Sequence, residues 1–284
     1  MTLALSASDR AALAERHKAA IDGSLRTRLT TIAVVVGLVG LFVYGLSTLE
    51  VSFWRLVGGF GNLGTFVVLM LPPDPGSWAR GMLFFKALIE TIAIAFLGTI
   101  LAAILAFPLG FLAAKNVVAN RVVHFLARRS MDTVRGVDAL IWALIWVNVV
   151  GLGPFAGMLA IMTSDLGAFG KLYSEAIESA DRKPVEGVTS MGGNKLHEIR
   201  FGLIPQVLPV IASQVLYYIE SNTRSSTIIG IVGAGGIGLY LAETIRTLEW
   251  QQVSFLILLI LAAVTAIDFI SAKLRFAIIG RRAV

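Results

Sequence analysis

Long apolar stretches separated by short basic clusters constrain the fold of this chain more than any other feature. A helix of about 20 apolar residues crosses the hydrocarbon core of a bilayer, and in lipid a helix satisfies its own backbone hydrogen bonds. The stretches that fit this length lie at 29–49, 82–114, 133–151, 153–172, 205–226 and 253–272. The sequence therefore predicts an all-α, polytopic membrane protein with about six transmembrane helices.

The composition agrees with lipid as the solvent and excludes several classes of function. Hydrophobic residues make up 56% of the chain and charged residues 15%, whereas a soluble domain carries about 25% charged residues. A chain of 284 residues with this many spans leaves no room for a separate soluble catalytic domain of roughly 100 residues. It has no Cys, and its three His are far apart in the sequence. We expect no metal site, no cofactor bound by this chain and no enzymatic activity.

The positions of the basic residues predict the orientation of the chain, because cytoplasmic segments of membrane proteins are rich in Lys and Arg. With the N-terminus inside, the Lys and Arg that fall outside are Arg55, Arg80, Lys86, Arg224 and Arg246, out of 24 in the chain. We therefore expect a multi-pass protein of the bacterial inner membrane with both termini in the cytoplasm. Basic residues that recur between apolar stretches are typical of membrane topology and not of a nucleic-acid surface.

The same pattern divides the chain into a core and peripheral parts. Glycines and prolines between the first two apolar stretches disfavour another spanning helix there. We expect a cytoplasmic tail at 1–28, a first transmembrane helix at 29–49, a periplasmic interfacial segment at 50–81, a core at 82–275 and a cytoplasmic tail at 276–284.

A polar segment at 173–204 interrupts the core on the expected cytoplasmic side. It has helical content, with Pro184 placed for a helix N-terminus and a break at Gly192-Gly193-Asn194 between two short helical stretches. An ordinary amphipathic loop would have this composition as well, so the spacing of particular residues decides the interpretation.

That spacing resembles the EAA loop of ATP-binding-cassette (ABC) importer permeases, E-A-A-x3-G-x9-I-x-L-P. Glu186, Gly192 and Pro205 occupy its anchor positions, in a cytoplasmic loop before the penultimate span. The match is imperfect, because four positions of the pattern hold Gly187, Val188, Gly202 and Ile204.

In that family the loop is a coupling element that docks into a groove of the ATPase subunit. The resemblance implies that 173–204 is the coupling segment of this chain. Gly192 permits a sharp backbone turn, and Pro205 starts the next span with little slack. The residues assigned to ATPase coupling are Glu186, Gly187, Met191, Gly192, Gly193, Asn194 and Pro205.

Further motifs between Met82 and Arg275 resemble the phosphonate-type branch of these permeases. They read GLGPFAG from Gly151, DRxPxE from Asp181, IPQVLP from Ile204 and ESNTRSST from Glu220. The resemblance implies a type I ABC importer core that moves phosphonate or a related phosphorus oxyanion, such as phosphite or hypophosphite. It also implies two ATPase subunits that hold ATP and Mg, an extracytoplasmic substrate-binding protein, and a second permease chain in a homodimer, with no nucleic acid involved.

Charged residues in the spans mark a candidate pathway, because ionisable groups inside a membrane usually face a cavity or a partner. Glu220 and Arg224 lie one turn apart, roughly 22 and 28 Å along the helix from Pro205 by the rise per residue, which places them in the outer half. Two interpretations stay open, an i,i+4 salt bridge or an outer mouth where Arg224 attracts an oxyanion. The residues assigned to the translocation pathway and outer gate are Asn148, Glu220, Asn222, Arg224, Ser225 and Thr227.

Other functions are compatible with parts of this sequence. An ABC permease for methionine or a choline-like substrate is the nearest alternative. An ion-coupled secondary transporter would use intramembrane carboxylates such as Glu90, Asp138 or Asp268, but it usually shows internal repeats, and none is visible. The run from Gly233 to Gly238 matches G-x-G-x-x-G, but a dinucleotide site needs a strand and a helix around it. We expect closely packed or re-entrant backbone there instead.

Overall fold

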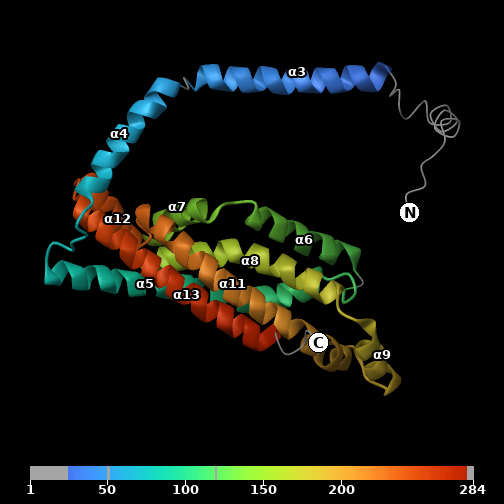
Figure 1. Ribbon diagram of the computed structural model, residues 1–284. Helices are drawn as coiled ribbons and strands as arrows, with labels where there is room; N and C mark the ends of the chain where they lie inside the picture. Colours follow the sequence, from blue (N-terminus) through green and yellow to red (C-terminus); the bar gives the residue numbers. More distant parts are fainter. Residues whose placement is uncertain (1–24, 50–51, 119, 280–284) are drawn as a thin grey trace, which may run out of the picture. The chain divides into compact units, whose positions relative to one another are not determined.

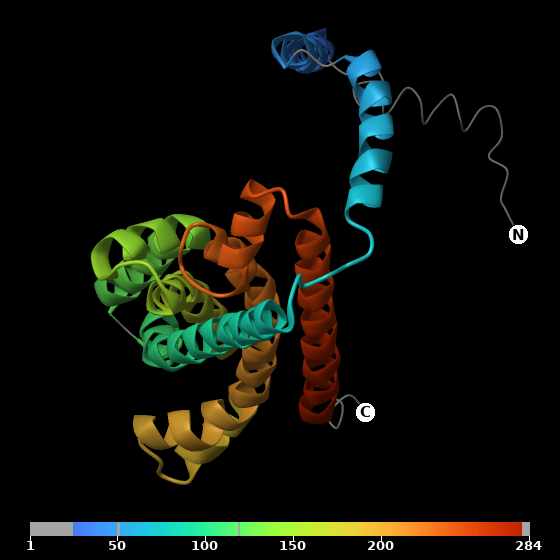
Figure 2. The same ribbon diagram turned by 90° about the vertical axis from the view of Figure 1, so that its left-hand side faces the viewer.

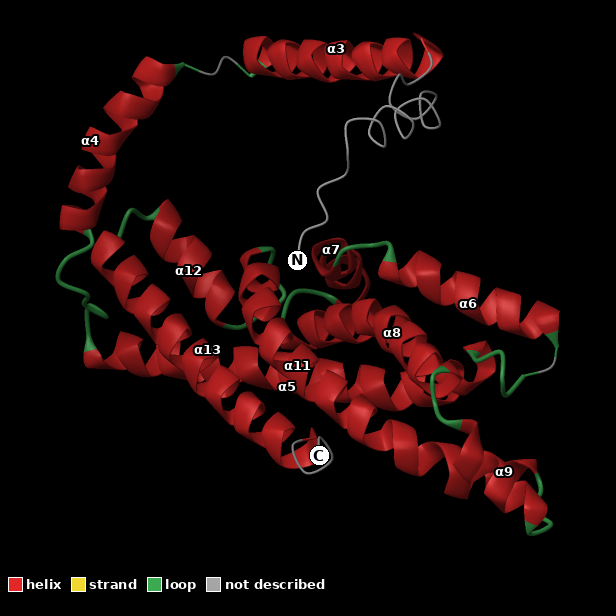
Figure 3. Cartoon of the chain, turned by 45° about the vertical axis from the view of Figure 1, so that its right-hand side comes forward, coloured by secondary structure: helices red, strands yellow, loops and turns green. Residues whose placement is uncertain are grey.

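The computed structural model describes residues 25–49, 52–118 and 120–279, and every regular element in these ranges is a helix (Figures 1 and 3). This confirms the predicted all-α class. The chain divides into two compact units, up to Thr65 and from Phe66 onward.

The first unit holds α3 (Leu25–Thr48) and most of α4 (Phe53–Leu69). The stretch Thr27–Thr48 of α3 has a mean hydropathy of 2.3 and no buried residue in its most apolar window, as expected for a helix surrounded by lipid. α4 is a 17-residue helix whose apolar part, Val57–Leu69, is shorter than a usual span. The interfacial placement of 50–81 stays a prediction.

The second unit is a helical bundle with a hairpin at one end. Its elements are α5 (Trp78–Ala113), α6 (Arg121–Arg135), α7 (Ala139–Val150), α8 (Pro154–Glu178), α9 (Arg182–Ser190), α10 (Lys195–His197), the π-helical turn η1 (Glu198–Leu203), α11 (Ile204–Ile231), α12 (Ile237–Arg246) and α13 (Trp250–Ile279). Figure 2 shows the hairpin around α9, in yellow and gold, extending beyond the C-terminal end of α13. In Figure 1, α12 lies at the opposite end of the bundle from α9.

Close packing of α5 against α8 forms the centre of the bundle. Fully buried alanines line α5, and a Cβ placed at Gly110 would lie 2.6 Å from the Cβ of Tyr173. Small residues bring helix backbones together where lipid supplies no hydrophobic drive for association. The large side chains of Phe169 and Tyr173 on α8 fill the adjoining core.

The spanning helices agree with the predicted number. Four helices are long and apolar enough to cross a membrane, namely 27–48, 78–113, 195–231 and 250–278, and the bent pair α6–α7 forms a fifth candidate. α8 is 25 residues long and contains Asp165 and Lys171, which lower its hydropathy. It tolerates them because it packs inside the bundle and not against lipid. Counting α8 as the sixth gives about six spans.

The predicted span at 133–151 is not a single straight helix. The helices α6 and α7 meet there at an angle of 88°. Gly136, which has a low helix propensity, ends α6, and the side chain of Asp138 accepts a hydrogen bond from the backbone N–H of Leu140. Asp138 therefore starts a new helix and does not continue the old one.

Candidate coupling hairpin and polar pathway

The polar segment after α8 folds into a compact hairpin. Asp181 caps the N-terminus of α9, because its side chain accepts a hydrogen bond from the N–H of Lys183, and α9 contains no buried residue. The chain reverses at Gly192, whose φ of +80° belongs to the left-handed region that favours glycine. Asn194 then caps α10 by accepting the N–H of His197 at 3.0 Å. Met191 lies at the turn with 90% of its surface exposed.

The two arms of the hairpin are in direct contact. The hydroxyl of Thr189 donates to the carboxylate of Glu198 at 2.9 Å, and the N–H of Gly193 donates to the carbonyl of Val188 at 3.0 Å. A Cβ at Gly202 would lie 3.0 Å from the Cα of Val185. Gly202, which stands where the EAA pattern has Ile, therefore lies where the two arms cross in close contact.

Gln206 ties the base of the hairpin to α11. Its side-chain oxygen accepts the N–H of Asp181 at 3.0 Å, and its amide nitrogen donates to the carbonyl of the same residue at 3.1 Å. The same nitrogen also donates to the carbonyl of Gly202 at 2.7 Å. Because η1 continues into α11 through Pro205, the hairpin and the helix form one connected element. Gln206 was not among the predicted site residues, although its place after Pro205 was a signal for it.

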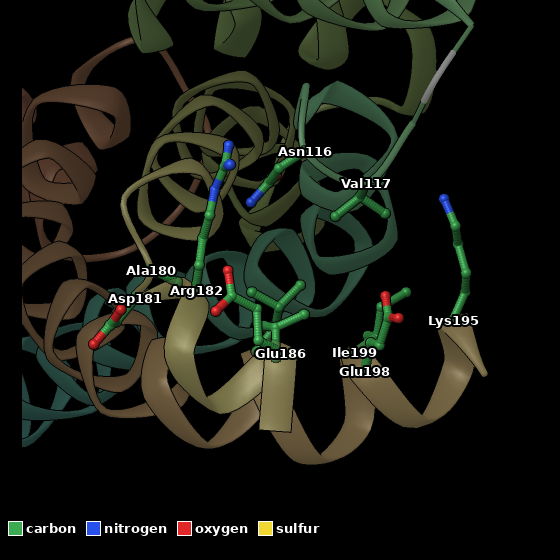
Figure 4. Close-up of a pocket in the computed structure, with 11 residues that line it drawn as sticks. Asn116, Val117, Ala180, Asp181, Arg182, Glu186, Lys195, Glu198 and Ile199 are labelled. Atoms are coloured by element: carbon green, nitrogen blue, oxygen red, sulfur yellow. The ribbon is translucent and has the colours of Figure 1, made fainter. Parts of the chain in front are cut away.

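A cavity of about 230 Å³ separates the hairpin from the loop that follows α5. Figure 4 shows Glu186 and Arg182 on α9 and Lys195 and Glu198 on the returning arm around this space, with Asn116 across it. The amide of Asn116 donates to the carbonyl of Ile177 at 2.8 Å, which fixes the opposite wall to the end of α8. Glu186 therefore faces a cavity of mixed polar and apolar lining at the base of the hairpin.

A buried polar group joins three helices in the middle of the bundle. The amide nitrogen of Asn222 on α11 donates to the hydroxyl of Thr99 on α5 at 2.7 Å and to the carboxylate of Asp165 on α8. All three residues are buried, with Thr99 fully inaccessible. Asp165 lies near the midpoint of α8, so this contact is at mid-length in the bundle. Thr99 and Asp165 were not predicted as members of the site.

The next polar group on α11 is an ion-pair cluster. Glu220, buried in the bundle, binds Arg224 through Oε1 at 3.3 Å and Arg275 of α13 through Oε2 at 2.8 Å. The predicted i,i+4 salt bridge is therefore present, and a second arginine joins it. Arg275 was not among the predicted site residues, and no local pattern linked it to Glu220.

The placement of this cluster in the outer half of the membrane stays a prediction. Glu220 lies two residues before Asn222, whose partners are in the middle of α5 and α8. The first turns of α11 also pack inside the bundle, where Val207 and Ile211 are buried in the same core cluster as Phe169. On α11 the cluster therefore lies next to the buried polar group at Asn222, and on α13 it lies near the C-terminal end of the helix, at Arg275.

The remaining predicted pathway residues do not join this cluster. Asn148 is on the exposed face of α7, and its amide donates to the carbonyl of Leu144 in its own helix at 2.7 Å. The hydroxyls of Ser225 and Thr227 donate to backbone carbonyls one turn earlier on α11, each at 3.4 Å.

The glycine-rich run after α11 forms a tight turn that leads into α12. The N–H of Gly236 donates to the carboxylate of Glu90 at 2.8 Å, and the N–H of Ile237 donates to the hydroxyl of Thr91 at 2.7 Å. The carbonyl of Gly233 accepts the N–H of Gly153 at 3.0 Å. Glu90 therefore satisfies backbone donors at the start of a helix, where a negative charge is favourable. This geometry agrees with packed backbone and not with a nucleotide site.

Comparisons with known proteins fit the geometry of the hairpin and bundle. The chain is 39% identical over 257 residues to a putative phosphite transport system permease protein of Stutzerimonas stutzeri, covering 90% of this chain and 89% of the relative. It is 35% identical over 252 residues to a phosphate-import permease protein of Mycolicibacterium smegmatis, covering 88% of this chain and 47% of that protein.

A solved structure shares the fold at low sequence identity. The inward-facing methionine ABC transporter superposes with a TM-score of 0.62 at 18% identity, covering 71% of this chain and 99% of the other. Residues 106–282 match the family described as the binding-protein-dependent transport system inner membrane component. This match includes the hairpin, α11 and α13. The chain therefore belongs to the family of inner membrane components of binding-protein-dependent transport systems.

Proposed function

We propose that this chain is the membrane-spanning permease subunit of an ABC importer that moves phosphonate or a related phosphorus oxyanion, such as phosphite or hypophosphite, into the cytoplasm. The similarity to a phosphite transport permease along nine-tenths of the chain is the observation that carries the proposal. The chain itself provides the gated pathway, and separate ATPase subunits hold ATP and Mg and hydrolyse the nucleotide.

The hairpin is the part that receives the force of ATP hydrolysis. Its exposed helix α9 and the tip at Met191 dock into a groove of the ATPase subunit. Because Gln206 holds the base of the hairpin to α11, a displacement of the tip becomes a tilt of that helix. A loop without these contacts would absorb the movement and leave the pathway unchanged.

The partners follow from the same proposal. Two ATPase subunits bind the hairpins of two permease chains, which form a homodimer, and an extracytoplasmic protein delivers the substrate. Both termini lie in the cytoplasm, on the side of the hairpin. The chain contributes the pathway residues Glu220, Asn222 and Arg224, and the binding protein supplies most of the selectivity. A tight site in the permease would slow release into the cell.

Two alternative functions have less support. The structural likeness to a methionine transporter has 18% sequence identity, which indicates the fold and not the substrate. An ion-coupled transporter would use free intramembrane carboxylates. Of the three candidates, Glu90 binds the turn before α12 and Asp138 caps α7, which leaves Asp268 alone.

The decisive experiment measures ATP hydrolysis by the complex purified with its ATPase and binding protein. We expect binding protein loaded with phosphite or methylphosphonate to stimulate hydrolysis, and binding protein with methionine to have no effect. The double variant Glu186→Ala/Gly192→Pro should lose the stimulation while the complex still assembles. Uptake that follows a proton or sodium gradient without any ATPase would instead support a secondary transporter.

A further inference from the structure

The carboxylate of Glu220 is shared by arginines from two helices. Arg224 reaches it from one turn along α11, and Arg275 reaches it from α13. The Cζ atom of Arg275 also lies 5.9 Å from the centre of the Tyr217 ring, within the range of a cation–π contact. Three side chains of α11 and one of α13 therefore form a single cluster at this point.

The two ion pairs are not equivalent. The pair with Arg275 is short, at 2.8 Å, and the side chain of that arginine is 28% exposed. The pair with Arg224 is longer, at 3.3 Å, and half of the Arg224 side chain is exposed. Arg275 therefore anchors Glu220 between the helices, while Arg224 is the weaker and more accessible partner.

The cluster contains two guanidinium groups and one carboxylate within ion-pair distance. The nearest further acid along this face of α13 is Asp268, two turns before Arg275, and it forms no ion pair with any residue in 52–118 or 120–279. Charged groups inside a membrane are expensive unless they are paired or face water. The excess of positive charge in this cluster therefore favours an anion that approaches from the exposed side of Arg224.

We propose that Glu220 is a resident counter-ion, which a phosphorus oxyanion displaces from Arg224 while Arg275 keeps the carboxylate in place. This inference rests on the proposed function, because it assumes an anionic substrate. The oxygens of phosphite or a phosphonate match the fork of the Arg224 guanidinium as well as a carboxylate does. When the substrate leaves, Glu220 returns to Arg224 and limits how long the anion stays. Weak binding in the pathway is thus a consequence of internal competition.

This arrangement predicts that substitutions of Glu220 and of Arg275 change the affinity for an oxyanion in opposite directions. Glu220→Gln removes the competitor and keeps the side-chain shape, so Arg224 should bind an oxyanion more tightly. Arg275→Gln releases Glu220, which then pairs with Arg224 alone, so the oxyanion should bind more weakly. If the ion pair only stabilised the fold, both variants would bind the oxyanion more weakly than the wild type.

The test is isothermal titration of the permease–ATPase complex in nanodiscs with phosphite and with methylphosphonate, without binding protein and at constant ionic strength. We expect the dissociation constant to fall about tenfold in Glu220→Gln and to rise roughly threefold in Arg275→Gln. Arg275→Lys, which keeps a charge beside Glu220, should lie near the wild type, and Arg224→Gln should abolish binding. The control Asp268→Asn removes a carboxylate of α13 that forms no ion pair in the described part of this unit, and it should leave the dissociation constant unchanged.

A double variant separates competition from simple loss of charge. In the Glu220→Gln background there is no competitor left to release, so adding Arg275→Gln should change binding less than it does in the wild type. Additive effects, or weaker binding in Glu220→Gln, would overturn the exchange mechanism and leave the proposed function intact. A wild-type complex that binds neither phosphorus compound would also overturn the exchange mechanism, whereas the substrate class is tested separately by stimulation of ATP hydrolysis through the loaded binding protein. If Glu220→Gln fails to assemble, Glu220→Asp shortens the reach to Arg224 and must also tighten binding.

Discussion

The coupling hairpin and the mid-bundle polar residues are positioned by different kinds of contact. The hairpin buries no residue of α9, and caps, a glycine turn and the amide of Gln206 hold its shape. The polar residues at mid-length depend on side chains that meet from separate helices, as Asn222, Thr99 and Asp165 do. A surface element of this kind tolerates exchange of most side chains, whereas a buried polar group tolerates almost none.

The largest effect is expected from Asn222→Leu. This change leaves the carboxylate of Asp165 buried without its amide partner, which should destabilise the bundle by about 3 kcal/mol. Thermal unfolding of the purified chain in detergent would measure the loss. Ser225→Ala is the matched control, because that hydroxyl only donates to a carbonyl of its own helix. Equal stability of the two variants would show that the buried network adds little.

A smaller loss is expected from Gln206→Leu. The change removes hydrogen bonds to Asp181 and Gly202 and should cost about 2 kcal/mol. The more informative readout is coupling: the ATPase should still bind, while the ratio of transport to ATP hydrolysis falls roughly tenfold as the hairpin loosens. Gln214→Leu, two turns along α11, should leave this ratio unchanged. If both variants transport normally, coupling does not depend on the hydrogen bonds of Gln206.

Gly192→Ala should destabilise the chain by about 1 kcal/mol, because a residue with a Cβ is strained at a φ of +80°. Gly187→Ala makes the same chemical change inside α9, where a Cβ would meet no atom within 4 Å. There the substitution should be neutral or stabilise by up to about 1 kcal/mol, since alanine favours helix. Unfolding curves of the two variants should therefore shift in opposite directions. Equal shifts would argue against the turn geometry.

The smallest effect on stability is expected at the tip. Met191→Ser changes an exposed side chain and should alter the unfolding free energy by less than about 0.5 kcal/mol. If the tip docks into the ATPase, the affinity between the subunits should nevertheless fall about fivefold in a direct binding assay. Leu152→Ser, also exposed and outside the hairpin, controls for a general loss of apolar surface. Unchanged affinity in Met191→Ser would place the docking surface elsewhere.

The hairpin was largely predictable, because its determinants are local. A glycine turn, a helix cap and a proline at the start of a span act over a few residues, so their spacing in 181–205 carries the geometry. The crossing of Val185 and Gly202 and the role of Gln206 could not be predicted, since both depend on how the two arms face each other.

By itself the sequence determined which stretches enter the membrane, the all-helical class and the position of the hairpin. Hydropathy, charge and turn residues act through the solvent and the local backbone, so they can be interpreted from one chain. The tertiary structure alone decided that Asp165 meets Asn222 and that Arg275 completes the cluster at Glu220. The residues of these two contacts lie 57 and 55 positions apart, and helix packing brings them together without a local signal.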